Sequence, residues 1–385
     1  MLVDVVGLFA GIGGLELGLK SAGFDTSLLC EIDPPARQVL STEFPDIELT
    51  EDVRKLRALP TGTDIVTAGF PCQDLSQAGR TAGISGSRSG LVDQVFRLIK
   101  RKRGPRWLVL ENVPFMLQLD RGKAMHHLTR SLTDMDYRWA YRVVDARAFG
   151  LPQRRHRVVM LASRTEDPRS RLFGQSFTPP IDVRSGSEPC GFYWTEGRGG
   201  LGWAVNGVPT IKAGSSIGIA SPPAVWIPGE GVVMLGINGA EELQGFPTNW
   251  TASAVEAGVR PGHRWRLVGN AVSTRVSTWI GQQLQDSEPP AYDGSNDPEV
   301  TGSWPTAAWG DRSGSYAASG VTMWPEAATP EPIEKYLADA TPLSARATAG
   351  FLRRANSGSL RFEDGFLNGV HQHLENMTTL LDRSA

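Results

Sequence analysis

The sequence predicts an α/β fold in which helices cover an open sheet, and three features of the chain favour this class. Short apolar runs recur along the first 165 residues, as buried strands of a parallel sheet require. Segments in which apolar residues have helical spacing separate several of these runs. The runs end in glycine-rich or polar loops, and ligands of open α/β sheets bind at the carboxyl ends of the strands. We therefore expect a functional site at that edge.

The composition is that of an ordinary globular protein. The chain has 385 residues, 40% hydrophobic and 21% charged, which is enough for two or three domains. No apolar run has membrane-spanning length and no apolar leader follows Met1, which favours a cytoplasmic protein without a membrane partner. Three cysteines without a C-x-x-C pair argue against a disulfide framework and a cysteine-rich zinc site, so no metal is expected.

The charge is unevenly distributed. Residues 286–385 hold 14 acidic and seven basic side chains, whereas the preceding residues hold 32 basic and 27 acidic ones. Nine arginines lie within residues 138–171 against three acids. Such an excess can face the phosphates of nucleic acid, although most charged runs are only solvated surface.

The first strand and the turn after it predict a site for a nucleotide-like ligand. Residues 3–9 form an apolar run, and residues 10–14 form a glycine turn before a helix at residues 15–22. The turn is close to the dinucleotide fingerprint but fails it, because Glu16 stands where the last glycine is required.

The second strand, residues 26–30, ends at an acidic cluster. Glu31 lies 20 positions after Gly11, the spacing at which an acid reaches the hydroxyls of a ribose. Asp33 precedes a proline and is better suited to begin the following helix as its N-cap.

Cys72 lies in a loop directly after a third apolar strand, residues 64–68. Pro71 restricts the backbone before the thiol. A lone cysteine is more often a small buried hydrophobe. Residues 77–90, rich in glycine and serine, are typical of a lid.

Two further polar clusters adjoin strands. Glu111 and Asn112 follow the apolar residues 107–110, and the arginine-rich residues 153–157 lead into the apolar residues 158–161. Thiol, carboxylate and guanidinium groups at one sheet edge fit nucleophilic attack on a polar heterocycle.

Five segments occur in the order typical of the DNA (cytosine-5) methyltransferases of bacteria and phages, and the resemblance runs from about residue 3 to about residue 284. The segments are Gly69-Phe70-Pro71-Cys72-Gln73, Glu111-Asn112-Val113, Gln153-Arg154-Arg155-His156-Arg157, Leu243-Gln244-Gly245-Phe246-Pro247 and Gly269-Asn270-Ala271-Val272. Five segments in this order with plausible spacing are hard to obtain by chance.

The resemblance implies methyl transfer from S-adenosylmethionine to C5 of a cytosine flipped out of duplex DNA, bound by one copy of the chain. Because C5 is a poor nucleophile, Cys72 would first add to C6 and form a covalent intermediate. Glu111 would share a proton with N3, Arg155 would bind O2 and Arg157 would fix the catalytic loop.

The resemblance also implies binding residues. Those expected at the cofactor are Phe9, Gly11, Gly13, Gly14, Glu31, Ile32, Asp52, Val53, Pro71, Leu91, Asn270 and Ala271. Those expected at the DNA are Gln73, Ser76, Asn112, Gln153, Arg154 and Thr210. A core role for Leu91, a turn-ordering role for Asn112 and a surface salt bridge for Arg154 remain open.

The family fold is a Rossmann-like S-adenosylmethionine-dependent methyltransferase sheet with a small loop-rich target recognition domain, here followed by an accessory helical segment. We expect residues 1–164 to form the catalytic domain and residues 165–250 the recognition domain. Residues 251–285 would return to the sheet. Residues 286–300 have a linker composition, and residues 301–385 would form an acidic accessory domain of unknown role.

One segment departs from the family pattern. Relatives usually carry an arginine, a threonine and an acid before the Leu243 segment, and this chain has Val233, Gly236 and Gly239 there. We expect weaker support of the recognition domain as a result.

Three alternatives remain. A relative with the same motifs could methylate RNA, and a degenerate relative could hold DNA without turnover. A nicotinamide-dependent oxidoreductase would need the missing glycine and would not need Cys72.

Overall fold

The computed structural model describes residues 4–70, 90–101, 104–180, 186–198, 200–214 and 220–384. The chain divides into two compact units. Unit 1 comprises residues 1–149, 156–179 and 271–327, and unit 2 comprises residues 150–155, 180–270 and 328–385.

Unit 1 is built on a sheet of nine described strands in the order β15-β14-β6-β8-β5-β4-β1-β2-β3. The strands are β1 (Asp4–Leu8), β2 (Asp25–Cys30), β3 (Glu48–Thr50), β4 (Thr63–Ala68), β5 (Trp107–Asn112), β6 (Arg138–Asp145), β8 (His156–Ser163), β14 (Ala307–Asp311) and β15 (Gly314–Ala317). Strands β1 to β5 pair in parallel, and β8, β6, β14 and β15 continue the sheet antiparallel. The predicted α/β class is confirmed.

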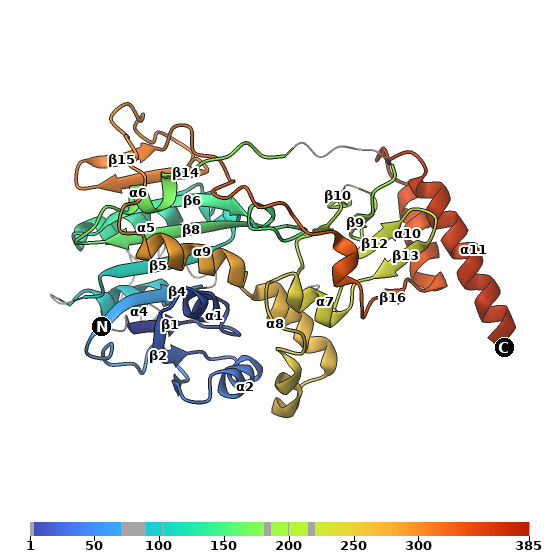
Figure 1. The fold of residues 1–385 in the computed structure, drawn as a ribbon, viewed down its shortest axis with the longest axis horizontal. Coiled ribbons are helices and arrows are strands. Elements are labelled where there is room, and N and C mark those ends of the chain that lie inside the picture. Colours follow the sequence, from blue (N-terminus) through green and yellow to red (C-terminus); the bar gives the residue numbers. More distant parts are fainter. Residues whose placement is uncertain are drawn as a thin grey trace. The chain divides into compact units, whose positions relative to one another are not determined.

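Helices cover both faces of this sheet (Figure 1). They are α1 (Gly14–Ser21), α2 (Pro34–Glu43), α4 (Leu91–Ile99), α5 (Lys123–Asp134), α6 (Pro168–Phe173) and α9 (Thr274–Gln285), with the 3-10 turns η2 (Pro114–Leu117) and η3 (Ala146–Ala148). Neighbouring residues of β1 point to opposite faces, so Val6 packs with residues of α4 and α5 while Val5 packs with residues of α9. Burial on both faces explains why these strands are almost wholly apolar.

Unit 2 contains a five-stranded sheet in the order β10-β9-β12-β13-β16 and a separate parallel pair, β11-β7. The strands are β7 (Gln153–Arg154), β9 (Cys190–Phe192), β10 (Ala204–Val205), β11 (Val208–Pro209), β12 (Ala224–Ile227), β13 (Gly231–Met234) and β16 (Thr341–Pro342). The helices and 3-10 turns are α7 (Ile237–Glu242), η4 (Ala252–Ala257), η5 (Pro261–His263), α8 (Arg264–Asn270), η6 (Ile333–Tyr336), α10 (Ala345–Asn356) and α11 (Phe366–Ser384).

Residues 301–385, for which the sequence predicts an accessory domain, are shared between the two units. Strands β14 and β15 form a hairpin that extends the large sheet beside β6. Helices α10 and α11 instead bury Phe351, Phe366 and Val370 in the core of unit 2. The expected linker, residues 286–300, belongs to unit 1.

Candidate active site

The glycine turn joins the end of β1 to the start of α1, as the sequence predicts. Gly11 and Gly13 have φ angles of 57° and 84°, a left-handed backbone that glycine adopts without strain. Phe9, which precedes the turn, also has a positive φ angle, of 55°. A methyl group built on Gly11 would meet no atom within 4 Å, whereas one on Gly13 would lie 2.4 Å from the ring of Phe44. Gly14 begins α1 and is buried. Gly11 therefore presents an open backbone edge.

Glu31 lies across this turn. Its Oε2 accepts a hydrogen bond from the Gly11 amide at 2.8 Å, and its Oε1 accepts one from the Asp33 amide at 2.8 Å. Burial raises the pKa of Glu31, and these bonds act in the opposite direction. Asp33 occupies the N-cap position of α2 without a side-chain capping bond. The spacing argument thus brings Glu31 to the glycine turn.

Four other residues expected at the cofactor differ in exposure. Ile32, next to Glu31, is 58% exposed, which is unusual for a large apolar side chain in this fold. Val53 is buried, and Leu91 is half-buried against the core. The carboxylate of Asp52 accepts bonds from the backbone and side chain of Arg54, which lower its pKa.

Behind the glycine turn lies a buried acid to which the sequence analysis gave no role. Glu16 is fully buried on α1, and its Oε1 accepts a 2.7 Å hydrogen bond from the Thr67 hydroxyl on β4. Burial raises its pKa to about 7. Leu15 and Leu19 of α1 are buried as well, so Glu16 belongs to the covered face of the helix, and no local sequence signal marks it.

The carboxyl ends of β4 and β5 meet at the edge where the sequence predicts chemistry. The Asn112 side chain donates a 2.9 Å hydrogen bond to the Phe70 carbonyl and accepts one from the Val113 amide. A methyl group on Gly69 would lie 3.8 Å from Oε2 of Glu111. The carboxyl group of Glu111 is therefore adjacent to the backbone that leads into residue 72.

Arg157 at the start of β8 binds this carboxyl group. Its Nε lies 2.9 Å from Oε1 of Glu111, which is buried, and Arg157 itself is mostly covered. Burial lowers the pKa of Arg157, while the charge of Glu111 raises it. The ion pair fixes the orientation of Glu111 at the sheet edge.

Arg155 is held within unit 2. Its side chain is buried and donates hydrogen bonds to the carbonyls of Ile211 at 3.3 Å and Gly269 at 3.0 Å. Gln153, also buried, donates to the Leu243 carbonyl at 2.9 Å and accepts from the Ile211 amide at 3.2 Å. Both side chains are therefore almost completely covered by protein, although an arginine-rich segment suggests exposed side chains.

Four remaining predicted residues lie in different settings. Arg154 is exposed and donates to the Trp203 carbonyl, and the Thr210 hydroxyl donates to the Arg154 carbonyl at 2.6 Å. Asn270 ends α8 and is exposed, whereas Ala271 is buried. The expected roles of these four residues in binding the cofactor or DNA stay predictions.

The arginine-rich stretch 138–171 is largely used inside unit 1. Arg142 is fully buried and donates to the carbonyls of Leu172, Gln175 and Thr322. Three other arginines of the stretch pair with its own acids: Arg147 with Asp145, Arg169 with Asp167, and Arg171 with Glu166. Local charge excess therefore indicates internal bonding here more than a phosphate-binding face.

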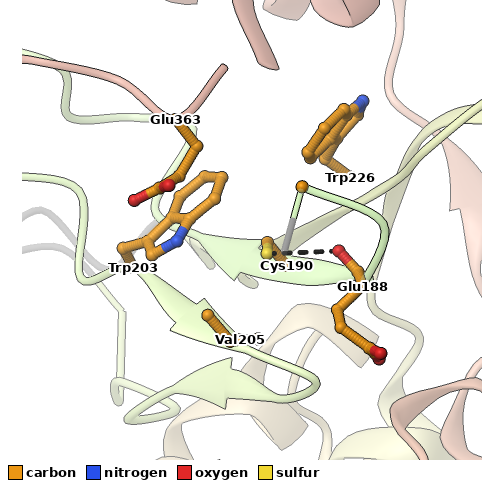
Figure 2. A pocket seen from close by; sticks show the side chains of 7 residues that line it. Glu188, Cys190, Trp203, Val205, Trp226 and Glu363 are labelled. Atoms are coloured by element: carbon orange, nitrogen blue, oxygen red, sulfur yellow. Dashed lines mark hydrogen bonds between the residues drawn. The ribbon is translucent and has the colours of Figure 1, made fainter. Parts of the chain in front are cut away.

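Two cysteines lie within the described residues, and neither environment suits a nucleophile. Burial and nearby acids raise the pKa values of Cys30 and Cys190 to about 12. Figure 2 shows Cys190 in a small cavity, where its thiol donates to the Glu188 carbonyl at 3.3 Å and Glu363 lies nearby. Reactive thiols need the opposite electrostatic setting.

Four predicted site residues lie outside the described part of the chain: Pro71, Cys72, Gln73 and Ser76.

Among the described side chains, no group of three or more His, Cys, Asp or Glu residues could hold a metal ion. No described helix has the length and hydropathy of a bilayer-crossing segment.

Comparison with known proteins identifies the family. The model of the C-5 cytosine-specific DNA methylases matches residues 3–187. The type II methyltransferase M2.BsuMI of Bacillus subtilis is 50% identical over 96% of this chain and 98% of its own length. The type II methyltransferase M.HhaI of Haemophilus parahaemolyticus is 32% identical over 42% of this chain and 49% of its own length.

The fold is also that of solved methyltransferases. The crystal structure of the S. pombe Dnmt2 methyltransferase has a TM-score of 0.55 at 16% identity and covers 74% of this chain and 98% of that one. The chain belongs to the family of C-5 cytosine-specific DNA methylases. It is a DNA (cytosine-5-)-methyltransferase, as the sequence motifs predict.

Proposed function

We propose that the chain transfers a methyl group from S-adenosylmethionine to C5 of a flipped-out cytosine at a specific sequence of duplex DNA, through a bond between Cys72 and C6. The Bacillus subtilis relative that is 50% identical to this chain is a type II methyltransferase, which supports a role in a restriction-modification system. One observation carries the proposal: Asn112 and Glu111 adjoin the backbone of Phe70 and Gly69, the second and third residues before Cys72.

The residues around the glycine turn fit the proposed cofactor. Gly11 offers an open backbone edge, and each carboxylate oxygen of Glu31 can accept a further hydrogen bond from a ribose hydroxyl. The exposed side chain of Ile32 offers an apolar surface for an adenine ring. When bound, S-adenosylmethionine supplies a methyl group on a positively charged sulfur.

The reaction needs a nucleophile and a proton donor on the pyrimidine ring. The Cys72 thiolate adds to C6 while Glu111 gives a proton to N3, so the ring becomes an electron-rich enamine at C5. C5 takes the methyl group and then loses its own proton to a base. The electron pair left at C5 re-forms the C5–C6 double bond, Cys72 leaves as thiolate, and N3 returns its proton to Glu111.

Arg157 and Arg155 support these steps in different ways. The contact of Arg157 Nε with Oε1 holds the carboxyl group of Glu111 in place, so that Oε2 is the oxygen that carries the proton given to N3. The buried bonds of Arg155 to two carbonyls preorganise a guanidinium whose N–H groups can donate to O2 as negative charge develops there.

Bisulfite sequencing of plasmid DNA from cells that express the protein tests this proposal. We expect one protected cytosine in a short recurring sequence, and no protection with the Cys72→Ser variant. Duplex DNA with 5-fluorocytosine at that site should crosslink to residue 72. Parallel assays of labelled methyl transfer to duplex DNA and to tRNA distinguish the DNA methyltransferase from the RNA alternative. Label in the tRNA with none in the DNA would refute the proposal.

A further inference from the structure

The start of α7 is bound by a carboxylate from a distant part of the chain. Oδ2 of Asp339 accepts a hydrogen bond from the Asn238 amide at 2.7 Å, and Oδ1 accepts one from the Gly239 amide at 3.1 Å. The first amides of a helix have no partner within the helix. Asp339 satisfies two of them from 100 residues away.

Two glycines make this contact possible. A Cβ on Gly236 would lie 2.1 Å from Cγ of Asp339, and one on Gly239 would lie 2.0 Å from the Tyr336 carbonyl oxygen. A side chain at position 236 would displace the carboxyl group of Asp339, and one at position 239 would require the backbone at Tyr336 to move. Gly239 is the position at which the family pattern carries an acid, so an acid there and the segment at 336–339 exclude each other.

The other end of α7 leads to Arg155 through buried hydrogen bonds. The Leu243 carbonyl accepts from Gln153, whose side-chain oxygen binds the Ile211 amide. The carbonyl of Ile211 in turn accepts from Arg155.

A second route passes through α8. Gln244, which is fully buried, donates to the Val268 carbonyl at 3.1 Å, and the carbonyl of the next residue, Gly269, accepts from Arg155. Both routes begin at the end of α7, so the position of this short helix sets the position of the guanidinium.

We propose that Asp339 is a positioning residue for methyl transfer, and that the C-terminal segment 328–385 replaces the acid missing at position 239. Asp339 fixes α7, and α7 fixes Arg155 through Gln153 and Gln244. The inference rests on the proposed function, because it assigns Arg155 to the reaction.

The test compares three variants of the full chain: Asp339→Ala, Asp339→Asn and Ser344→Ala. Ser344 lies in the same segment, and its hydroxyl accepts a hydrogen bond from the Ala347 amide at the start of α10, away from α7. It is the matched control for losing a helix cap. Asparagine at 339 keeps one side-chain oxygen as an acceptor.

We expect the alanine variant at 339 to lower kcat for duplex DNA about tenfold or more, because small misplacements of a positioned group have effects of this size. The KM for S-adenosylmethionine should stay unchanged, the asparagine variant should recover part of the rate, and the Ser344 variant should keep it. Equal losses at 339 and 344, no loss at 339, or an asparagine variant no better than alanine would overturn the proposal.

Hydrogen exchange separates this inference from the proposed function. In the Asp339→Ala variant, amides in residues 237–244 and 150–155 should exchange faster than in Ser344→Ala. This result does not require methyl transfer, so a wild-type chain that transfers no methyl group would refute the function alone. Unchanged exchange at 150–155 would refute the coupling alone.

Discussion

Replacing Glu16 by glutamine should stabilise the protein at pH 8 and change its stability far less at pH 5. The Glu16 side chain is fully buried, and burial raises its pKa from an ordinary 4.5 to about 7, partly offset by the bond from Thr67. Between these two values the folded chain holds a proton that the unfolded chain has lost. Stability therefore falls as the pH rises through this window, and the loss is complete above pH 7.

The size of the effect follows from the proton affinities. A tenfold change in affinity corresponds to about 1.4 kcal/mol, so the raised pKa costs the wild-type chain about 3 kcal/mol at pH 8. Glutamine is neutral at every pH and can still accept from Thr67. Its amide group would take the place of Oε2, which has no hydrogen-bond partner among the described residues. In this respect glutamine resembles the protonated acid.

Urea denaturation of both proteins at pH 5 and pH 8 measures this difference directly. Part of the cost, about 1 kcal/mol, is already present at pH 5 because the unfolded carboxyl group is then mostly ionised, so the gain from glutamine should be between about 2 and 3 kcal/mol larger at pH 8 than at pH 5. Glu48→Gln makes the same chemical change at an exposed position of β3 and should show little pH-dependent gain. A gain at position 16 that is equal at both pH values would show that Glu16 ionises normally in the folded state.

Three further substitutions test the site and the packing beneath it. Asn112→Ala should destabilise the fold by about 1 kcal/mol and lower kcat without weakening S-adenosylmethionine binding; unchanged kcat would remove Asn112 from the positioning of the nucleophile. Glu111→Gln should lower kcat by about 10² or more, since an amide cannot transfer the proton and loses the ion pair with Arg157; near-normal turnover would refute the acid role. Gly18→Ala would place a methyl group 2.4 Å from Oγ of Ser277, so the melting temperature should fall as expected for a loss of about 1–3 kcal/mol, and an unchanged value would refute this α1–α9 packing.

The sequence predicted the parts of the site that local pattern controls. The glycine turn, the spacing from Gly11 to Glu31 and the placement of Glu111 after an apolar strand all depend on a few consecutive residues. A parallel sheet brings the ends of such strands to one edge. Asn112 and Phe70 therefore meet although they are 42 residues apart.

Features that depend on distant packing were not predictable in this way. The β14 and β15 hairpin was not expected because nothing in residues 307–317 indicates which sheet edge they extend. The contact of Asp339 with α7 depends on Gly236 and on Gly239, which is 100 residues earlier, and a glycine in sequence does not show what occupies the space it leaves. The burial of Glu16 was missed because an acid on a helix is usually exposed.

Gly236 and Gly239 in place of the family's threonine and acid predict weaker support of the recognition domain, and under the proposal above Asp339 supplies that support instead. An acid at position 239 would have to be accommodated where the Tyr336 carbonyl now lies. The carboxylate of Asp339 reaches the same helix end from outside and leaves the buried bonds of Gln153 and Gln244 in place. Since those bonds end on backbone carbonyls, they depend on where the chain runs and little on neighbouring side chains. A family motif can therefore change its residues here as long as another segment holds the helix.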